Sequence, residues 1–212
     1  MFESFAAGTK TYMKAGTYNV SAAITITVGI GTATNLNHWV GYTTIPGDYT
    51  TLGAAKPLIN MAGAQFTLGN FLQIFHVDFT GTSTNVTVTN ATNYVFNSKA
   101  TNTSTTANRS AHSGVGFFDT CESTSQFGYG FSHTGSSAVT RLRRCYIHDS
   151  AIGLSLNSTT TDISECIIAN CTTAAIRNAT TTTNTTLTYS NNTIYGRLST
   201  PTGIGIDHTN AA

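Results

Sequence analysis

LRRCYI, at residues 142–147, places an apolar residue, two charged residues and a cysteine in a row, with a second apolar residue two positions after the cysteine. The stretches FDTCES at residues 118–123 and ISECII at residues 163–168 share the spacing of this frame, with an apolar residue three positions before the cysteine and a residue suited to an interior two positions after it. The cysteines of the three stretches are 24 and 21 residues apart. Because repeats of roughly 20–50 residues are typical of solenoids, this spacing predicts a stacked, repetitive fold.

The frame extends in both directions beyond the cysteines. It fits IFHVDF at residues 74–79, VFNSKA at residues 95–100 and YSNNTI at residues 189–194. The fourth position of the frame then forms one column, and its members are Val77, Ser98, Cys121, Cys145, Cys166 and Asn192. The steps between them are 21, 23, 24, 21 and 26 residues, so each repeat is one coil of about 21–26 residues.

Composition favours an all-β chain. Only 9% of the 212 residues are charged, 40% are hydrophobic, and Thr, Val, Ile, Tyr and Phe are abundant. These residue types favour strands, whereas a disordered chain would be rich in charge and poor in aromatic residues. The length suits one domain with a continuous core. We therefore predict a single-stranded right-handed parallel β-helix, in which equivalent side chains of neighbouring coils form columns.

Further apolar clusters locate the other strands of each coil. They lie at residues 127–131, 152–156, 174–176 and 204–206, and we expect their glycines at corners or close backbone approaches. Thr/Ser/Asn runs at 102–106 and 180–186 are predicted loops. We predict one domain over residues 1–212, with irregular early coils at 1–70 and regular coils at 71–212. Because neither end has a clear polar cap, we expect a fragment of a longer polypeptide.

Four short stretches resemble the pectate lyase-like right-handed parallel β-helix superfamily: GTY at 16–18, ITI at 24–26, CYIHDS at 145–150 and NNTIYG at 191–196. The resemblance covers nearly the whole chain. It implies the fold, but that superfamily includes lyases, hydrolases, phage tailspikes and adhesins, so it does not choose among activities. No catalytic motif of these enzymes matches, and we transfer no catalytic residues.

The cysteine column is interpreted as structural. Metal ligands must converge on one point, whereas these thiols are spaced one per coil, and we predict neither a metal nor a cofactor. A buried free cysteine acts as a small apolar residue, and Asn192 would continue the column as an interior amide. Cys171 is expected at a turn, with exposure to solvent and a Cys166–Cys171 disulfide as two open alternatives.

Charged residues near the column alternate in sign between neighbouring coils. Asp119 is followed one coil later by Arg143, and Arg144 is followed by Glu165. The position after the column reads Asp78, Lys99 and Glu122. Opposite charges on adjacent strands contribute roughly 0.2–1 kcal/mol each, so we interpret these seven residues as pairs that fix register.

The alternative is a polysaccharide lyase or glycoside hydrolase on this outward face. Hydrolysis needs two carboxylates about 5–9.5 Å apart, and a lyase needs an arginine base with calcium-binding carboxylates. The candidate catalytic residues are Asp119, Glu122, Arg143, Arg144, His148 and Asp149. For the pair His148-Asp149, a turn in which Asp149 caps the backbone is the competing interpretation.

Function is expected to lie on surfaces. We predict a non-catalytic β-helix segment of an extracellular or virion surface protein that contacts a polysaccharide or cell-surface glycan, with a homotrimer as a further expectation. Hydroxyl and amide groups and exposed aromatics such as Tyr146 and Tyr195 suit sugars. A net charge of +1 argues against nucleic acid, and no apolar run is long enough for a membrane span.

Overall fold

Strands stacked in parallel make up the computed structural model, which describes residues 7–22, 24–25, 32–48, 55–133, 139–156, 160–178, 186–196 and 204–208. Within these ranges every regular element is a strand, and the strands form three eight-stranded sheets. No helix in the described ranges is long and apolar enough to span a membrane. The all-β prediction is confirmed.

Each sheet takes every third strand of the chain. Sheet I contains β1 (Lys10–Lys14), β4 (Asn37–Tyr42), β7 (Leu72–Phe75), β10 (Tyr94–Phe96), β13 (Gly116–Asp119), β16 (Val139–Arg143), β19 (Thr160–Ser164) and β22 (Thr186–Ser190). Sheet II contains β2 (Gly16–Asn19), β5 (Pro57–Asn60), β8 (Asp78–Gly81), β11 (Lys99–Asn102), β14 (Glu122–Ser125), β17 (Tyr146–His148), β20 (Ile167–Ala169) and β23 (Thr193–Tyr195). Sheet III contains β3 (Ile24–Thr25), β6 (Phe66–Thr67), β9 (Asn85–Thr89), β12 (Ser110–Gly114), β15 (Tyr129–His133), β18 (Ile152–Leu156), β21 (Ala174–Asn178) and β24 (Ile204–His208).

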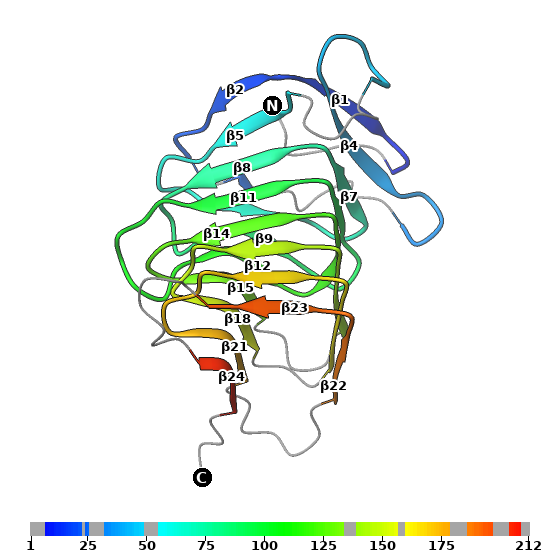
Figure 1. The fold of residues 1–212 in the computed structure, drawn as a ribbon. Coiled ribbons are helices and arrows are strands. Elements are labelled where there is room, and N and C mark those ends of the chain that lie inside the picture. The colour runs from blue at the N-terminus through cyan, green and yellow to red at the C-terminus, as the bar shows by residue number, and fades with distance from the viewer. Residues whose placement is uncertain are drawn as a thin grey trace.

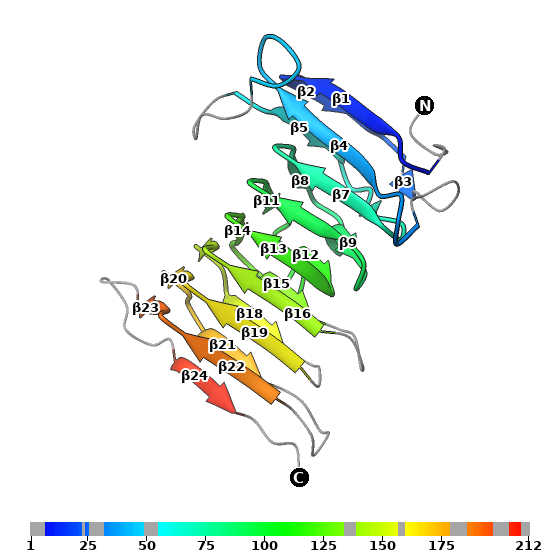
Figure 2. The ribbon, with the colours of Figure 1, turned by 90° about the vertical axis from the view of Figure 1, so that its right-hand side faces the viewer.

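Successive triplets of strands are therefore the coils of a parallel β-helix. Figure 1 shows the coils stacked from the N-terminal to the C-terminal end, and Figure 2 looks onto sheet I. The strand pairs of the described residues are parallel, for example Phe118 pairs with Leu142 and Leu142 with Ile163. The frame read from the sequence is thus the strand register itself. The stretch ITI at 24–26 is described only at residues 24–25, and the predicted loop at 180–186 is described only at Thr186, which begins β22.

The interior is filled by columns of side chains, one member per coil. Phe118, Leu142 and Ile163 form part of the sheet I column, and each is at most 1% exposed. The ring of His112 in sheet III packs against Phe118 and Phe131, with centroids 5.2 and 5.6 Å away, and the three rings contact one another. Removing these side chains from water is the main stabilising contribution to the stack, because no coil can bury its apolar face alone.

Glycines in or just before the strands of sheet III allow neighbouring coils to approach closely. A Cβ atom on Gly128 would lie 1.9 Å from the carbonyl oxygen of Arg109, and one on Gly153 would lie 2.5 Å from the carbonyl oxygen of Ala175. No side chain fits at such distances. These positions are the close backbone approaches expected from the sequence.

Cys121, Cys145 and Cys166 occupy the interior corner between sheets I and II, and Cys171 lies between a strand of sheet II and a strand of sheet III. All four are free and buried. Cys145 N donates to Cys166 Sγ at 3.4 Å, and Cys166 N donates to the side-chain oxygen of Asn192 at 2.8 Å. Neither alternative left open for Cys171 is found, because the residue is 5% exposed and its thiol is free. It lies beneath Gly153, where the missing Cβ leaves room for the sulfur.

We expect the native thiols to resist alkylation. The hydrogen bond with Cys121, together with burial, raises the pKa of Cys145, and burial raises the pKa of Cys171 to about 11. Because the thiolate is the reactive form, iodoacetamide at pH 8 should label the folded protein at least about 100-fold more slowly than the urea-unfolded protein. Mass spectrometry of the labelled peptides would measure this. Rapid labelling of Cys145 or Cys171 in the folded state would contradict their burial.

A left-handed residue turns the chain from sheet I into sheet II in six successive coils. These residues precede the cysteine column by one position and are His76, Asn97, Thr120, Arg144, Glu165 and Asn191, with φ between 47° and 58°. Asn adopts this conformation readily, whereas a β-branched residue such as Thr120 is strained there. The corner is thus regular in backbone shape although its side chains differ.

Thr120→Asn should stabilise the protein. Asparagine relieves the backbone strain, and its side chain can replace the hydrogen bond that Thr120 Oγ1 donates to Asp119 Oδ1 at 2.9 Å. We expect the free energy of unfolding to rise by about 0.5–1 kcal/mol in urea denaturation. The matched control is Thr80→Asn in β8, where the backbone is extended and no gain is expected. A loss of stability in Thr120→Asn would show that the corner is unstrained.

Candidate functional site

Asp119 and Arg144 form the tightest ion pair of the six residues selected from the sequence. Arg144 donates from Nε to Asp119 Oδ1 at 2.9 Å and from Nη2 to Oδ2 at 2.6 Å. Asp119 is the last residue of β13, and its carboxylate is almost fully buried against the guanidinium. Two parallel hydrogen bonds of this kind give geometric specificity as well as energy.

The predicted partners of Asp119 and Arg144 are therefore wrong in detail. The sequence paired Asp119 with Arg143 and Arg144 with Glu165, whereas Arg143 Nε lies 3.8 Å from Glu165 Oε2. Both ion pairs are diagonal. Each joins a residue two positions before the column, Asp119 or Arg143, to the residue one position before the column in the next coil, Arg144 or Glu165. The left-handed backbone of Arg144 and Glu165 turns their side chains back toward the preceding coil. All seven paired residues nonetheless form ion pairs.

A second cluster lies on the outer face of sheet II. Lys99 Nζ donates to Glu122 Oε1 at 2.6 Å, and His148 Nε2 lies 3.0 Å from the same oxygen. The other ring nitrogen, Nδ1, lies 2.7 Å from Asp149 Oδ2. The imidazole is also stacked on Tyr146, with centroids 4.1 Å apart. The structure thus brings together three of the predicted candidates, Glu122, His148 and Asp149. They form a cluster separate from the Asp119–Arg144 pair.

The ionisation of these groups does not suit acid catalysis. Burial raises the pKa of Asp119, but the hydrogen bonds from Arg144 and Thr120 outweigh it and hold the pKa below its usual value. For Glu122, too, burial is outweighed by Lys99 and His148, and the pKa is lowered. A general acid needs a raised pKa, so both carboxylates are shifted in the wrong direction.

Arg144 is equally unsuited to act as a lyase base. The hydrogen bonds to Asp119 raise the pKa of the guanidinium, which makes loss of its proton harder. No group of three or more His, Cys, Asp or Glu side chains in the described ranges is arranged to hold a metal ion.

Burial raises the pKa of the Asp78 carboxyl group. Its Oδ1 atom accepts a hydrogen bond from Lys99 N at 2.8 Å and lies 3.5 Å from Lys56 Nζ. The expected pairing of Asp78 with the Lys99 side chain is thus replaced by an ion pair with Lys56. These contacts tie β5, β8 and β11 together and leave the group in a structural position.

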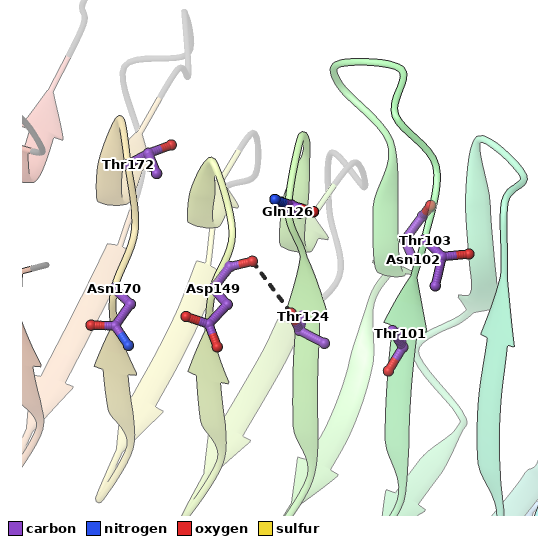
Figure 3. Close-up of a pocket in the computed structure, with 8 residues that line it drawn as sticks. All are labelled: Thr101, Asn102, Thr103, Thr124, Gln126, Asp149, Asn170 and Thr172. Atoms are coloured by element: carbon purple, nitrogen blue, oxygen red, sulfur yellow. Dashed lines mark hydrogen bonds between the residues drawn. The ribbon is translucent and has the colours of Figure 1, made fainter.

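A polar groove of about 400 Å³ opens where the strands of sheet II end. Figure 3 shows the side chains that line it, which come from four successive coils beginning at β11. They are Thr101, Asn102, Thr103, Thr124, Gln126, Asp149, Asn170 and Thr172. The lining consists of hydroxyl and amide groups with one carboxylate, and its residues recur at equivalent places in the coil.

Some of these groups hold the groove together and others remain open. Asn102 donates to the carbonyl oxygens of Ser83 and Ser110 at 3.0 and 2.9 Å, and Thr124 Oγ1 donates to the carbonyl oxygen of Asp149 at 3.3 Å. The side chains of Thr101, Gln126, Asn170 and Thr172 form no hydrogen bond with the part of the chain that the structure describes. The groove therefore presents uncommitted donors and acceptors on a fixed scaffold.

Of the groove residues, the sequence pointed only to Asp149. Thr, Asn and Gln are so common in this chain that no motif marks them. A signal does exist in the frame, because Asn102, Asp149 and Asn170 each lie four positions after the column residue. Extending the frame downstream would have placed them at one edge of the same sheet.

The fold is a parallel β-helix that resembles the fold of a pectate lyase. The solved structure titled "Crystal structure of pectate lyase Pel9A" aligns with a TM-score of 0.50 over 97% of this chain and 71% of that one, at 10% sequence identity. This likeness confirms the fold predicted from the sequence. No protein-family model matches the chain, and no curated protein matches it.

Proposed function

We propose that this chain is a non-catalytic β-helix segment of an extracellular or virion surface protein, and that the polar groove of sheet II binds a neutral saccharide. The observation that carries the proposal is the set of uncommitted hydroxyl and amide groups of Thr101, Gln126, Asn170 and Thr172 along one groove. Each can donate or accept, which suits sugar hydroxyls.

The dimensions of the helix support the same ligand class. Neighbouring coils are spaced by roughly 4.8 Å, which is about the length of one sugar unit. A glycan lying along the helix axis would therefore contact one coil with each sugar unit. Exposed aromatic rings such as Tyr146 and Tyr195 lie on the same sheet. The pectate lyase fold of the similar structure adds support for a polysaccharide ligand.

Non-catalytic binding is favoured over cleavage by the ion pairs. Asp119 is held by Arg144, and Glu122 by Lys99 and His148. Using either one as an acid or a nucleophile would break a contact between coils. In this proposal Asp119 and Glu122 stabilise the stack of coils, and the neutral side chains of the groove bind the saccharide.

Calorimetric titration with neutral oligosaccharides of six or more units tests the binding proposal. The double variant Thr101→Val/Gln126→Ala removes two open side chains without touching an ion pair. We expect its Kd to rise about tenfold, because two hydrogen bonds are worth about 1–3 kcal/mol. The matched control is Thr188→Val on the outer face of β22, which should bind as the wild type does. Equal binding by all three proteins, or binding by none, would refute the proposed groove.

A further inference from the structure

A second groove, of about 390 Å³, lies on the outer face of sheet I, on a different sheet from the polar groove. It spans β1, β4, β7 and β10 and the first corner residue after β7. Six of the residues that line it are Lys10, His38, Phe75, His76, Tyr94 and Phe96. In contrast to the polar groove, its lining is mainly aromatic.

The aromatic rings form a continuous strip across the coils. Phe75 packs edge-on against Tyr94 with centroids 5.7 Å apart, and His38 packs edge-on against Phe75 at 5.8 Å. Tyr94 stacks on Phe117 of the next coil at 4.9 Å, with an interplanar angle of 17°. Such mutual packing holds each ring in place before a ligand arrives, which lowers the entropic cost of binding.

The polar groups at this groove are neutral or positive. Burial, followed by the charge of Lys10, lowers the pKa of His38. Burial, followed by the charge of Lys56, lowers the pKa of His76 to about 4, and burial raises the pKa of Tyr94. Near neutral pH the histidines are therefore uncharged and the tyrosine keeps its proton.

Lys10 is the charged residue of the lining, and no carboxylate lines the groove. Lys10 Nζ lies 5.2 Å from the ring centre of Tyr12 and forms no ion pair with any residue that the structure describes. The groove thus combines flat apolar surface, neutral hydrogen-bonding groups and one uncompensated cation. This combination is complementary to an amphipathic ring that carries a negative charge.

We propose that the aromatic groove is a second saccharide site, which packs one sugar ring against Phe75 and Tyr94 and pairs an anionic substituent of that sugar, a carboxylate or a sulfate ester, with Lys10. The inference shares with the proposed function only the premise that the chain binds glycans. The two sites differ in sheet, in charge and in lining, so they select different sugars.

Titration calorimetry with three oligosaccharide classes tests this site: uronate hexamers, sulfated oligosaccharides and neutral hexamers. In wild-type protein we expect an anionic class to bind with an affinity that falls as salt increases. Lys10→Met should weaken that binding about tenfold and remove most of its salt dependence, and Phe75→Ala should weaken it at least as much. Neutral hexamers should bind the Lys10→Met variant as they bind the wild type.

Lys14→Met is the matched control, because Lys14 lies on the same strand and does not line the groove. It should bind anionic sugars as the wild type does, and Thr101→Val/Gln126→Ala should bind them normally too. Equal weakening by Lys14→Met would overturn the site, as would anionic binding that disappears only in the polar-groove variant. If sedimentation instead shows that Phe75→Ala dissociates an oligomer without changing sugar binding, the strip is an interface between copies and the proposal is wrong. Matching circular dichroism melts would confirm that Phe75→Ala folds.

Discussion

Phe118→Ala should lower the free energy of unfolding by about 3–5 kcal/mol, because it removes a large, fully buried side chain and leaves a cavity. The ring of Phe118 packs edge-on against Phe131 at a centroid distance of 4.5 Å and lies 5.2 Å from the ring of His112. The change therefore loosens contacts between sheets I and III in the middle of the stack.

Guanidinium denaturation followed by circular dichroism measures this effect. The matched control is Phe127→Ala, because Phe127 is 44% exposed in the turn before β15. We expect that change to alter stability by no more than about 0.5 kcal/mol. If the two substitutions cost the same, the column containing Phe118 does not lie inside the protein.

Acidification should destabilise the protein in a window set by buried histidines. Burial lowers the pKa of His112 to about 3 and those of His76 and His133 to about 4. The folded state therefore keeps these rings neutral, whereas the unfolded chain protonates them near pH 6.5. Protons favour the unfolded state, so their contribution to stability is present above pH 6.5 and is lost as the pH falls toward 4.

Each such histidine contributes a slope of about 1.4 kcal/mol per pH unit once the pH is well below 6.5. Urea unfolding at pH 7, 6 and 5 measures the slope before the lowered carboxyl pKa values of Asp119 and Glu122 become relevant. In His112→Leu we expect up to about one third of the slope to disappear, whatever the absolute stability of the variant, because His76, His133 and the less buried His38 also have lowered pKa values. Equal stability at pH 7 and pH 5, or an unchanged slope in His112→Leu, would show that these rings accept protons in the folded state.

The fold could be predicted because stacked parallel coils place equivalent inward-facing residues at a regular interval along the sequence. Cys121, Cys145 and Cys166 recur at the coil spacing, and each is flanked by residues that must point inward. Cys171 could not be placed in this way, because its burial depends on the absent side chain of Gly153 on another strand. The spacing of residues along the sequence does not show that Cys171 and Gly153 are in contact.

The candidate site was predicted less completely for a related reason. Opposite charges in neighbouring coils indicated pairing, but the partner of Asp119 depends on the left-handed backbone of Arg144. The residue type arginine does not predict a left-handed backbone. Both grooves are assembled from single side chains of several coils. Phe75 and Phe96 both lie two positions before the column, but Asp119 and Arg143 occupy the same position in later coils, so the sequence pattern there does not indicate an aromatic strip.

The central claim is that the outward carboxylates hold the coils together and do not cleave sugars. The most direct measurement is incubation of wild-type protein, Asp119→Asn and Glu122→Gln with a panel of neutral and acidic polysaccharides, scored for new reducing ends and unsaturated products. We predict no product above the protein-free blank from any of them, while Asp119→Asn loses about 1 kcal/mol of stability because Arg144 is half-exposed. Products that the wild type forms and that either variant fails to form would contradict the claim.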